Sequence, residues 1–169
     1  AFTGASQRHL GYAERAGDGI LFLDEIGELR AELQAKLLRL IEDRSFFRVG
    51  GERPIPFKGR LLIATNADLT KLVEAGKFRE DLYYRINVVS VKIPPLRERP
   101  DDISWLMEKF FADSSARIGT SLKGIGALAE EAALAYHWPG NVRELRNRME
   151  RAVALGMGQW VMPGDLFPE

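Results

Sequence analysis

The sequence predicts an α/β domain built on a parallel sheet, followed by an all-helical subdomain. Two observations predict this architecture. Before Pro94, short apolar runs typical of strands alternate with helical patterns, which is the order of a parallel sheet with crossover helices. After Pro100, the apolar residues recur at helical spacing. We therefore expect the boundary between the two parts to lie between these two prolines.

The composition is that of an ordinary soluble globular chain. Of its 169 residues, 46% are hydrophobic and 28% are charged. Lysine and arginine together number 24, as do aspartate and glutamate, so no basic excess indicates a nucleic-acid-binding surface. The absence of cysteine excludes a disulfide scaffold and a thiolate zinc site. No apolar run approaches the ~18 residues that a membrane span requires.

In the first part, β-branched and apolar runs predict strands, and periodic leucines predict helices. The leucines of residues 31–43 have the spacing of an amphipathic helix that buries Leu33, Leu37, Leu40 and Ile41. The expected elements are a helix over 7–15, a buried strand over 20–24, a helix over 31–43, a hairpin from 46–49 and 55–57, a strand over 60–66, helices over 69–75 and 78–84, and a third strand over 88–93.

The second part shows helix-start signals and apolar stripes. Pro100, with two aspartates directly after it, is typical of a helix N-terminus. A second helix is expected over 127–136, and Asn141 is expected to cap a third. The expected buried faces are Ile103, Leu106, Met107, Phe110 and Phe111 on the first of these helices, and Val142, Leu145, Met149 and Val153 on the third.

Two adjacent carboxylates, Asp24 and Glu25, end the first predicted strand. Parallel sheets bind ligands at the carboxyl ends of their strands, so this position suits a metal-bound nucleotide. There Asp24 would hold Mg²⁺, usually through water, because Mg²⁺ prefers hard oxygen ligands. Glu25 would orient or deprotonate an attacking water. A strand that simply ends in a solvated acidic turn is the alternative from this pattern alone.

Residues 1–5 read AFTGA, and residues 17–26 read GDGILFLDEI. Together they resemble the sigma-54 activator ATPases, the AAA+ family of bacterial enhancer-binding proteins, in which a GAFTGA loop contacts the sigma factor and an LFLDE segment is the Walker B strand. The resemblance implies sigma-54 contact by Phe2, Thr3 and Gly4. Because the chain starts one residue inside the loop motif, we expect it to be a fragment.

The resemblance extends along the core. Residues 61–66, LLIATN, resemble the sensor I strand, which implies that Asn66 senses the γ-phosphate of ATP. Residues 78–85, FREDLYYR, resemble the segment that supplies arginine fingers, Arg79 and Arg85, to the neighbouring subunit. Residues 48–51, RVGG, resemble a second insertion loop that moves with the first. From pattern alone, Asn66 could belong to a turn, and both arginines could be solvated helix charges.

Residues 138–147, WPGNVRELRN, resemble the sensor II segment of the family's lid, which implies that Arg143 reaches the nucleotide. Without the resemblance, Arg143 would be a charge on the wet face of an amphipathic helix. Residues 95–99, PLRER, resemble the link into the lid. The implied organisation is a partial AAA+ α/β core over 1–96, lacking its N-terminal strands, and a helical lid over 97–169.

The sequence contains no G-x-x-x-x-G-K-[ST] motif, the phosphate-binding loop of such ATPases. We therefore expect the parent protein to be the ATPase and this stretch alone to be inactive. The resemblance implies a cytoplasmic protein that uses ATP and Mg²⁺, assembles into a ring, likened to a hexamer, and remodels the sigma-54 RNA polymerase holoenzyme. DNA contact would require a helix-turn-helix domain outside this stretch.

Two other functions remain open from the sequence. One is a non-catalytic sigma-54-binding module that keeps the contact loop without nucleotide chemistry. The other is a different AAA+ machine, such as a helicase loader or a clamp loader. The Phe2–Gly4 segment argues against the second, because this loop is peculiar to sigma-54 activators.

Overall fold

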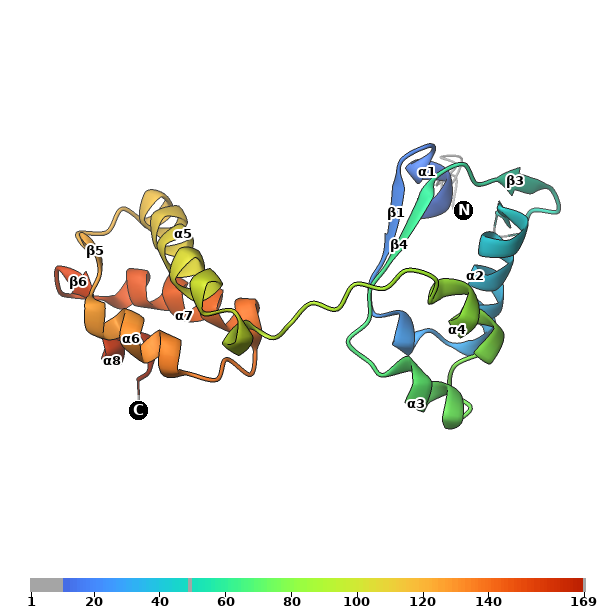
Figure 1. Ribbon diagram of the computed structural model, residues 1–169. Helices are drawn as coiled ribbons and strands as arrows, with labels where there is room; N and C mark the ends of the chain where they lie inside the picture. Colours follow the sequence, from blue (N-terminus) through green and yellow to red (C-terminus); the bar gives the residue numbers. More distant parts are fainter. Residues whose placement is uncertain (1–10, 49, 169) are drawn as a thin grey trace, which may run out of the picture. The chain divides into compact units, whose positions relative to one another are not determined.

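A pair of parallel strands forms the sheet of the first part of the chain. The computed structural model describes residues 11–48 and 50–168, and the chain divides into two units, 1–91 and 92–169. In the first unit, β1 (Ile20–Leu23) pairs with β4 (Arg60–Ile63) in register, so that Leu23 lies opposite Ile63 (Figure 1). The predicted parallel pairing of these two strands is confirmed.

Helices and a hairpin surround this sheet close to the predicted positions. The hairpin strands pair antiparallel, as expected. The remaining elements of the first unit are α1 (Tyr12–Ala16), the 3-10 helix η1 (Ile26–Glu28), α2 (Ala31–Asp43), β2 (Ser45–Phe47), β3 (Pro54–Pro56), α3 (Leu69–Glu74) and α4 (Glu80–Ile86).

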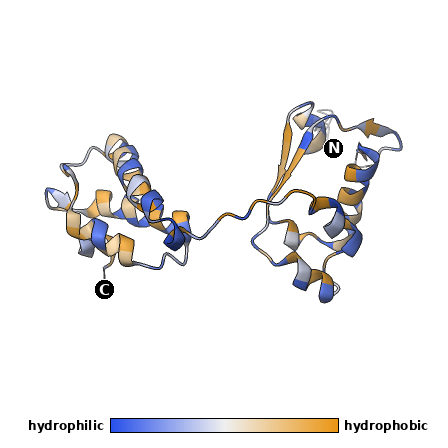
Figure 2. Ribbon diagram, viewed as in Figure 1, coloured by the Kyte–Doolittle hydropathy of each residue, from blue (hydrophilic) through white to orange (hydrophobic). Residues whose placement is uncertain are grey.

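The first strand was predicted to be buried on both faces, and this is wrong for the described residues. Ile20 and Phe22 of β1 are 64% and 53% exposed, and Leu62 of β4 is 55% exposed. The alternate residues of both strands pack against the core of the unit. Strand residues alternate between faces, so one face of this sheet is covered and the other presents apolar side chains to solvent. Figure 2 shows β1 hydrophobic along its length.

The third predicted strand, over residues 88–93, is also wrong. These residues form no strand, and Val88, Val89 and Val91 are strongly exposed. A strand requires a neighbour that takes up its backbone hydrogen bonds, and no described strand pairs with this segment. β-branched composition favours a pleated strand but cannot replace the missing partner.

Helix α2 occupies the predicted residues, but its buried face differs by one position. Leu37 and Leu40 are buried, and Ile41 is half-buried, as expected. Leu33 was expected in the same stripe and is instead exposed, whereas Gln34 is buried. The core that α2 completes contains the buried residues Ile26, Leu37, Leu40, Phe57, Phe78 and Leu82.

The second unit is mainly helical, with one short strand pair that the sequence did not predict. Strands β5 (Gly124–Ile125) and β6 (Trp160–Val161) pair in parallel and bring the two ends of the unit's chain together. The other elements are η2 (Leu96–Glu98), α5 (Pro100–Ile118), α6 (Ala127–Ala135), α7 (Asn141–Leu155) and α8 (Pro163–Leu166).

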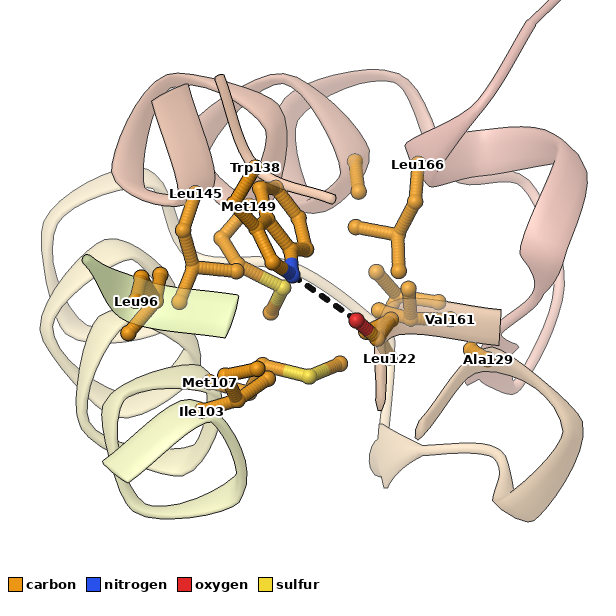
Figure 3. Close-up of a cluster of buried hydrophobic side chains, with 12 residues drawn as sticks. Leu96, Ile103, Met107, Leu122, Ala129, Trp138, Leu145, Met149, Val161 and Leu166 are labelled. Atoms are coloured by element: carbon orange, nitrogen blue, oxygen red, sulfur yellow. Dashed lines mark hydrogen bonds between the residues drawn. The ribbon is translucent and has the colours of Figure 1, made fainter. Parts of the chain in front are cut away.

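The core of the second unit forms where α5 packs along α7 (Figure 3). Trp138 is fully buried, and its indole N–H donates a 2.8 Å hydrogen bond to the Ala133 carbonyl. A buried indole N–H needs such a partner. The predicted faces of α5 and α7 are confirmed, since Ile103, Leu145 and Met149 are buried among these residues.

Asn141 does not cap α7 as predicted. Gly140 occupies the cap position and Asn141 is the first helical residue, with φ of 49°. The Gly140 amide donates instead to the Glu144 carboxylate at 2.9 Å. The Asn141 side chain turns away from its own helix and accepts a 2.8 Å hydrogen bond from the Leu96 amide.

Among the described residues, no helix combines the length and apolar character needed to cross a membrane.

Candidate functional site

Asp24 and Glu25 follow β1 directly, and both are exposed at its carboxyl end. The Glu25 amide donates a 2.9 Å hydrogen bond to Asp24 Oδ1. Glu25 adopts the left-handed conformation, with φ of 54° and ψ of 43°. Few residues other than glycine adopt this conformation, and those that do often lie at functional sites. The sharp turn separates the directions of the two neighbouring side chains.

Backbone hydrogen bonds hold this turn against the end of β4. The Ala64 amide donates to the Leu23 carbonyl at 2.8 Å, and the Ile26 amide donates to the Ala64 carbonyl at 3.1 Å. Asp24 and Glu25 lie between the two bonded residues, and Thr65 and Asn66 follow Ala64. The structure therefore brings the predicted carboxylates and Asn66 to the same edge of the sheet.

Gly27 permits close packing between these two segments. A Cβ atom at Gly27 would lie 2.9 Å from Ala67 Cβ and 3.4 Å from Thr65 Oγ1. Thr65 Oγ1 in turn accepts a 3.0 Å hydrogen bond from the Ala67 amide, which shapes the turn around the exposed Asn66. The two halves of the candidate site thus touch directly, and a larger residue at position 27 would push them apart.

The donor set fits a magnesium ion that also binds phosphate. Magnesium in nucleotide sites is commonly held by one or two carboxylates together with phosphate oxygens and water. Asp24 supplies one exposed carboxylate whose Oδ1 is oriented by the Glu25 amide. No described group of three or more histidine, cysteine, aspartate or glutamate side chains forms a metal site on its own.

Arg79 and Arg85 lie on another element, at the two ends of α4. Arg79 is the N-cap residue, and Arg85 lies in the last turn. The Arg79 guanidinium is bonded to both Asp81 oxygens, at 2.9 and 2.7 Å. These hydrogen bonds hold the pKa of the Asp81 carboxyl below its usual range. Arg85 is exposed and forms no hydrogen bond or ion pair with the described residues.

Arg143 belongs to the second unit, in the first turn of α7. It is exposed and lines a cavity of about 830 Å³ with Ile93, Pro94 and Pro95 on another wall. The hydrogen bond from the Leu96 amide to Asn141 ties that proline segment to the start of α7. The cavity therefore combines an apolar wall with a cationic side chain, which suits a ligand that has both a flat apolar part and negative charge.

The start of α7 is braced by Glu144, which the sequence analysis did not single out. Its carboxylate accepts hydrogen bonds from the Gly140 amide at 2.9 Å and from Arg148 at 2.7 and 2.9 Å. Burial by itself would raise the pKa of Glu144, but the Gly140 amide and the Arg148 guanidinium together outweigh it and lower the pKa. Glutamate three to four residues after a cap is a recognisable signal for such a brace.

The predicted sigma-contact residues Phe2, Thr3 and Gly4 lie outside the described residues. The first described helix after them, α1, carries Glu14, which forms a two-pronged ion pair with Arg48 beside β2. This contact joins residues 34 apart in the sequence. No local pattern could have predicted it.

Comparison with known proteins identifies both units. Residues 1–92 match the model of the sigma-54 interaction domain, and residues 97–169 match the model of the AAA+ ATPase lid domain. The chain is 50% identical over 155 residues to the nitrogen fixation protein AnfA of Azotobacter vinelandii, covering 92% of this chain and 29% of AnfA. It is 46% identical over 169 residues to the regulatory protein AtoC of Escherichia coli, covering all of this chain and 37% of AtoC. The chain thus spans about a third of the length of these relatives.

Solved structures agree with the sequence matches. NtrX from Brucella abortus, in complex with ATP, shares 38% sequence identity with a TM-score of 0.84, covering 92% of this chain and 36% of that one. NtrX in complex with ADP gives the same identity, score and coverage.

Proposed function

Because this chain belongs to the sigma-54 interaction domain family of AAA+ proteins, we propose that its full-length protein is an ATPase that remodels the sigma-54 RNA polymerase holoenzyme at promoters. The observation that carries the proposal is the meeting of Asp24, Glu25 and Asn66 at one edge of the parallel sheet. The ATP and ADP complexes of NtrX support nucleotide binding by this fold.

The roles proposed for these three residues follow from their chemistry. Asp24 would hold Mg²⁺ through water, and the ion, when bound, supplies positive charge beside the phosphates. Glu25 orients the attacking water and accepts its proton. Asn66 donates or accepts a hydrogen bond at the γ-phosphate and so distinguishes ATP from ADP. The left-handed turn at Glu25 supports distinct roles for the adjacent carboxylates.

Arg79 and Arg85 are proposed to act on the nucleotide of a neighbouring subunit in a ring, hexameric by analogy with the family. A guanidinium is always charged and planar, so it can grip the charge that develops on transferring phosphate oxygens. Arg85 is exposed, which supports this role. Arg79 must first leave Asp81 to take part.

The two matched regions support a division into a core over 1–96 and a lid over 97–169. Arg143 is proposed to reach the nucleotide from the lid, since it lines a cavity with an apolar wall. Its charge would meet the phosphates while Ile93 and the adjacent prolines contact the base.

Phe2, Thr3 and Gly4 are proposed to contact sigma-54. The partner, RNA polymerase, works in the bacterial cytoplasm, and we propose the same compartment for this protein. DNA contact would come from a domain outside this stretch. The family match argues against a helicase loader or a clamp loader, and a non-catalytic sigma-54-binding module remains the alternative that experiment must separate.

The test uses the full-length protein and the Thr3→Ala variant. A small hydroxyl on a contact loop serves binding rather than chemistry, so the variant should keep at least about half of the ATP turnover and lose sigma-54 binding. ATP hydrolysis and a sigma-54 pull-down measure the two properties separately. A wild-type protein that binds sigma-54 but hydrolyses no ATP would be the non-catalytic module. If Thr3→Ala lowered both properties together, the loop would have a structural or catalytic role.

A further inference from the structure

Gln34 is a buried polar side chain whose amide is bonded at both ends. It projects from α2 and is 1% exposed. Its Nε2 atom donates to the Leu29 carbonyl at 2.7 Å and to the Lys77 carbonyl at 3.0 Å. Its Oε1 atom accepts from the Arg79 amide at 2.9 Å. Both amide hydrogens and the amide oxygen are therefore used, as a buried glutamine requires.

These bonds join two segments that carry the proposed chemistry. Leu29 ends the 3-10 helix that begins directly after Glu25. Lys77 and Arg79 lie 43 and 45 residues from Gln34 in the sequence and form the entry to α4. One side chain thus spans from the carboxylate segment of a subunit to the arginine segment of the same subunit.

The bonds also settle how α4 begins. The Arg79 side chain makes no hydrogen bond to the first amides of α4, because its guanidinium is bonded to Asp81. Phe78 and Leu82 are buried and anchor this end of the helix in the core. Apolar packing resists removal from the core but is weakly directional, whereas hydrogen bonds fix direction and register. Gln34 provides that register from a neighbouring helix.

We infer that Gln34 is a positioning residue for the arginine fingers: it fixes Arg79, and through α4 also Arg85, relative to the rigid carboxylate segment of their own subunit. The inference rests on the proposed function, in which these arginines complete the neighbour's site. A displacement of about 1 Å is enough to lower a rate by about 100-fold when it misplaces a catalytic group. The remaining question is whether Gln34 acts through the fingers or only stabilises the core.

The experiment uses the full-length protein carrying Gln34→Met, which keeps the side-chain length and removes all three hydrogen bonds. We expect ATP affinity within about twofold of wild type and turnover lower by about 10- to 100-fold. Mixed with Glu25→Gln subunits, the variant should regain activity, because its own carboxylates are intact and its partner brings intact fingers. Mixed with Arg85→Ala subunits, it should regain none, because neither subunit brings fingers.

A matched control and a milder variant complete the design. Lys36→Met lies on the same helix, where its side chain is 67% exposed and bonded only to Glu32, and it should behave as wild type. If Gln34→Met fails to assemble, Gln34→Asn keeps the amide on a side chain one methylene shorter, which cannot reach all three partners. It should show the same mixing pattern with a smaller loss of turnover.

Two results would overturn the inference. Wild-type turnover by both Gln34 variants would mean that the fingers do not depend on this residue. A loss that Glu25→Gln subunits fail to rescue, in rings that still form, would mean a general structural defect. The proposed function fails separately: it fails if Arg79→Ala and Arg85→Ala themselves hydrolyse ATP at the wild-type rate.

Discussion

Asp24 and Glu25 are adjacent in sequence but differ in backbone conformation and in what their oxygens contact. Glu25 turns back in the left-handed conformation, and its amide engages Asp24 Oδ1. Its own carboxylate is exposed and forms no hydrogen bond with a described residue. This arrangement leaves Glu25 available for water and gives Asp24 a fixed orientation, so the two substitutions should have different consequences.

Glu25→Gln keeps the size of the side chain but removes its charge and its basicity. We expect ATP to bind within about threefold of wild-type affinity and turnover to fall by about 100-fold or more, since a general base contributes about 10² to 10⁴ in rate. Asp24→Ala should instead weaken Mg²⁺-dependent ATP binding. Titration with a fluorescent nucleotide and steady-state ATP hydrolysis separate the two effects. Equal losses of affinity in both variants would mean that the pair is a structural acidic turn.

At the scale of elements, the helices were largely predictable and the sheet was not. The apolar spacing of α2, α5 and α7 is local information, and these helices begin at the predicted residues. A strand depends on partners far along the sequence, so the valines near residue 89 resemble a strand yet form none. The same reason explains why the exposed face of β1 was mispredicted.

The candidate site was predictable where a motif carried it. Asp24, Glu25 and Asn66 lie at strand ends that the sequence marks, and the structure brings them to one edge. Gln34 was missed because an amphipathic pattern assigns buried positions to leucine. The Glu14–Arg48 pair was missed because nothing local relates two residues on separate elements.

That ion pair gives a prediction about the element that follows the sigma-contact loop. It joins α1 to the hairpin, so we expect Arg48→Glu to weaken sigma-54 binding by at least about fivefold, as like charges at this distance repel. The double variant Glu14→Arg with Arg48→Glu should recover most of the binding. Arg39→Glu, an exposed arginine of α2, is the control for charge alone. A pull-down in which the double variant binds no better than Arg48→Glu would show that the pair does not connect the two elements.

The brace at the start of α7 gives a pH-dependent prediction. The lowered pKa of Glu144 means that its ionised form stabilises the folded chain. This contribution is complete above the ordinary glutamate pKa and is lost as the pH falls through the lowered value. At neutral pH, Glu144→Gln should lower the free energy of unfolding by roughly 1.5–3 kcal/mol, and the difference from wild type should shrink on acidification.

Urea unfolding at a series of pH values measures this difference. Glu131→Gln, an exposed carboxylate of α6, should show no such pH-dependent gap from wild type. A gap for Glu144→Gln that stayed constant down to the most acidic point would mean that the carboxylate charge does not stabilise α7.

At the scale of the whole molecule, the central claim is that a complete site is shared between two subunits. The carboxylates and Asn66 meet on the sheet edge, whereas Arg85 lies exposed at the end of α4 without a described partner. A finger that acts on a neighbour contributes only at an assembled interface, where it can accelerate hydrolysis by about 10³ to 10⁵. Turnover per subunit should therefore rise with protein concentration across the range in which the ring assembles.

The most direct measurement mixes two inactive full-length variants, Arg85→Ala and Glu25→Gln, and follows ATP hydrolysis. Each variant alone should bind ATP and hydrolyse it poorly. In mixed rings, an Arg85→Ala subunit supplies intact carboxylates and its Glu25→Gln neighbour supplies an intact finger, so activity should return at those interfaces and reach a maximum at an intermediate ratio. No recovery at any ratio, in rings shown to contain both variants, would contradict a site shared between subunits.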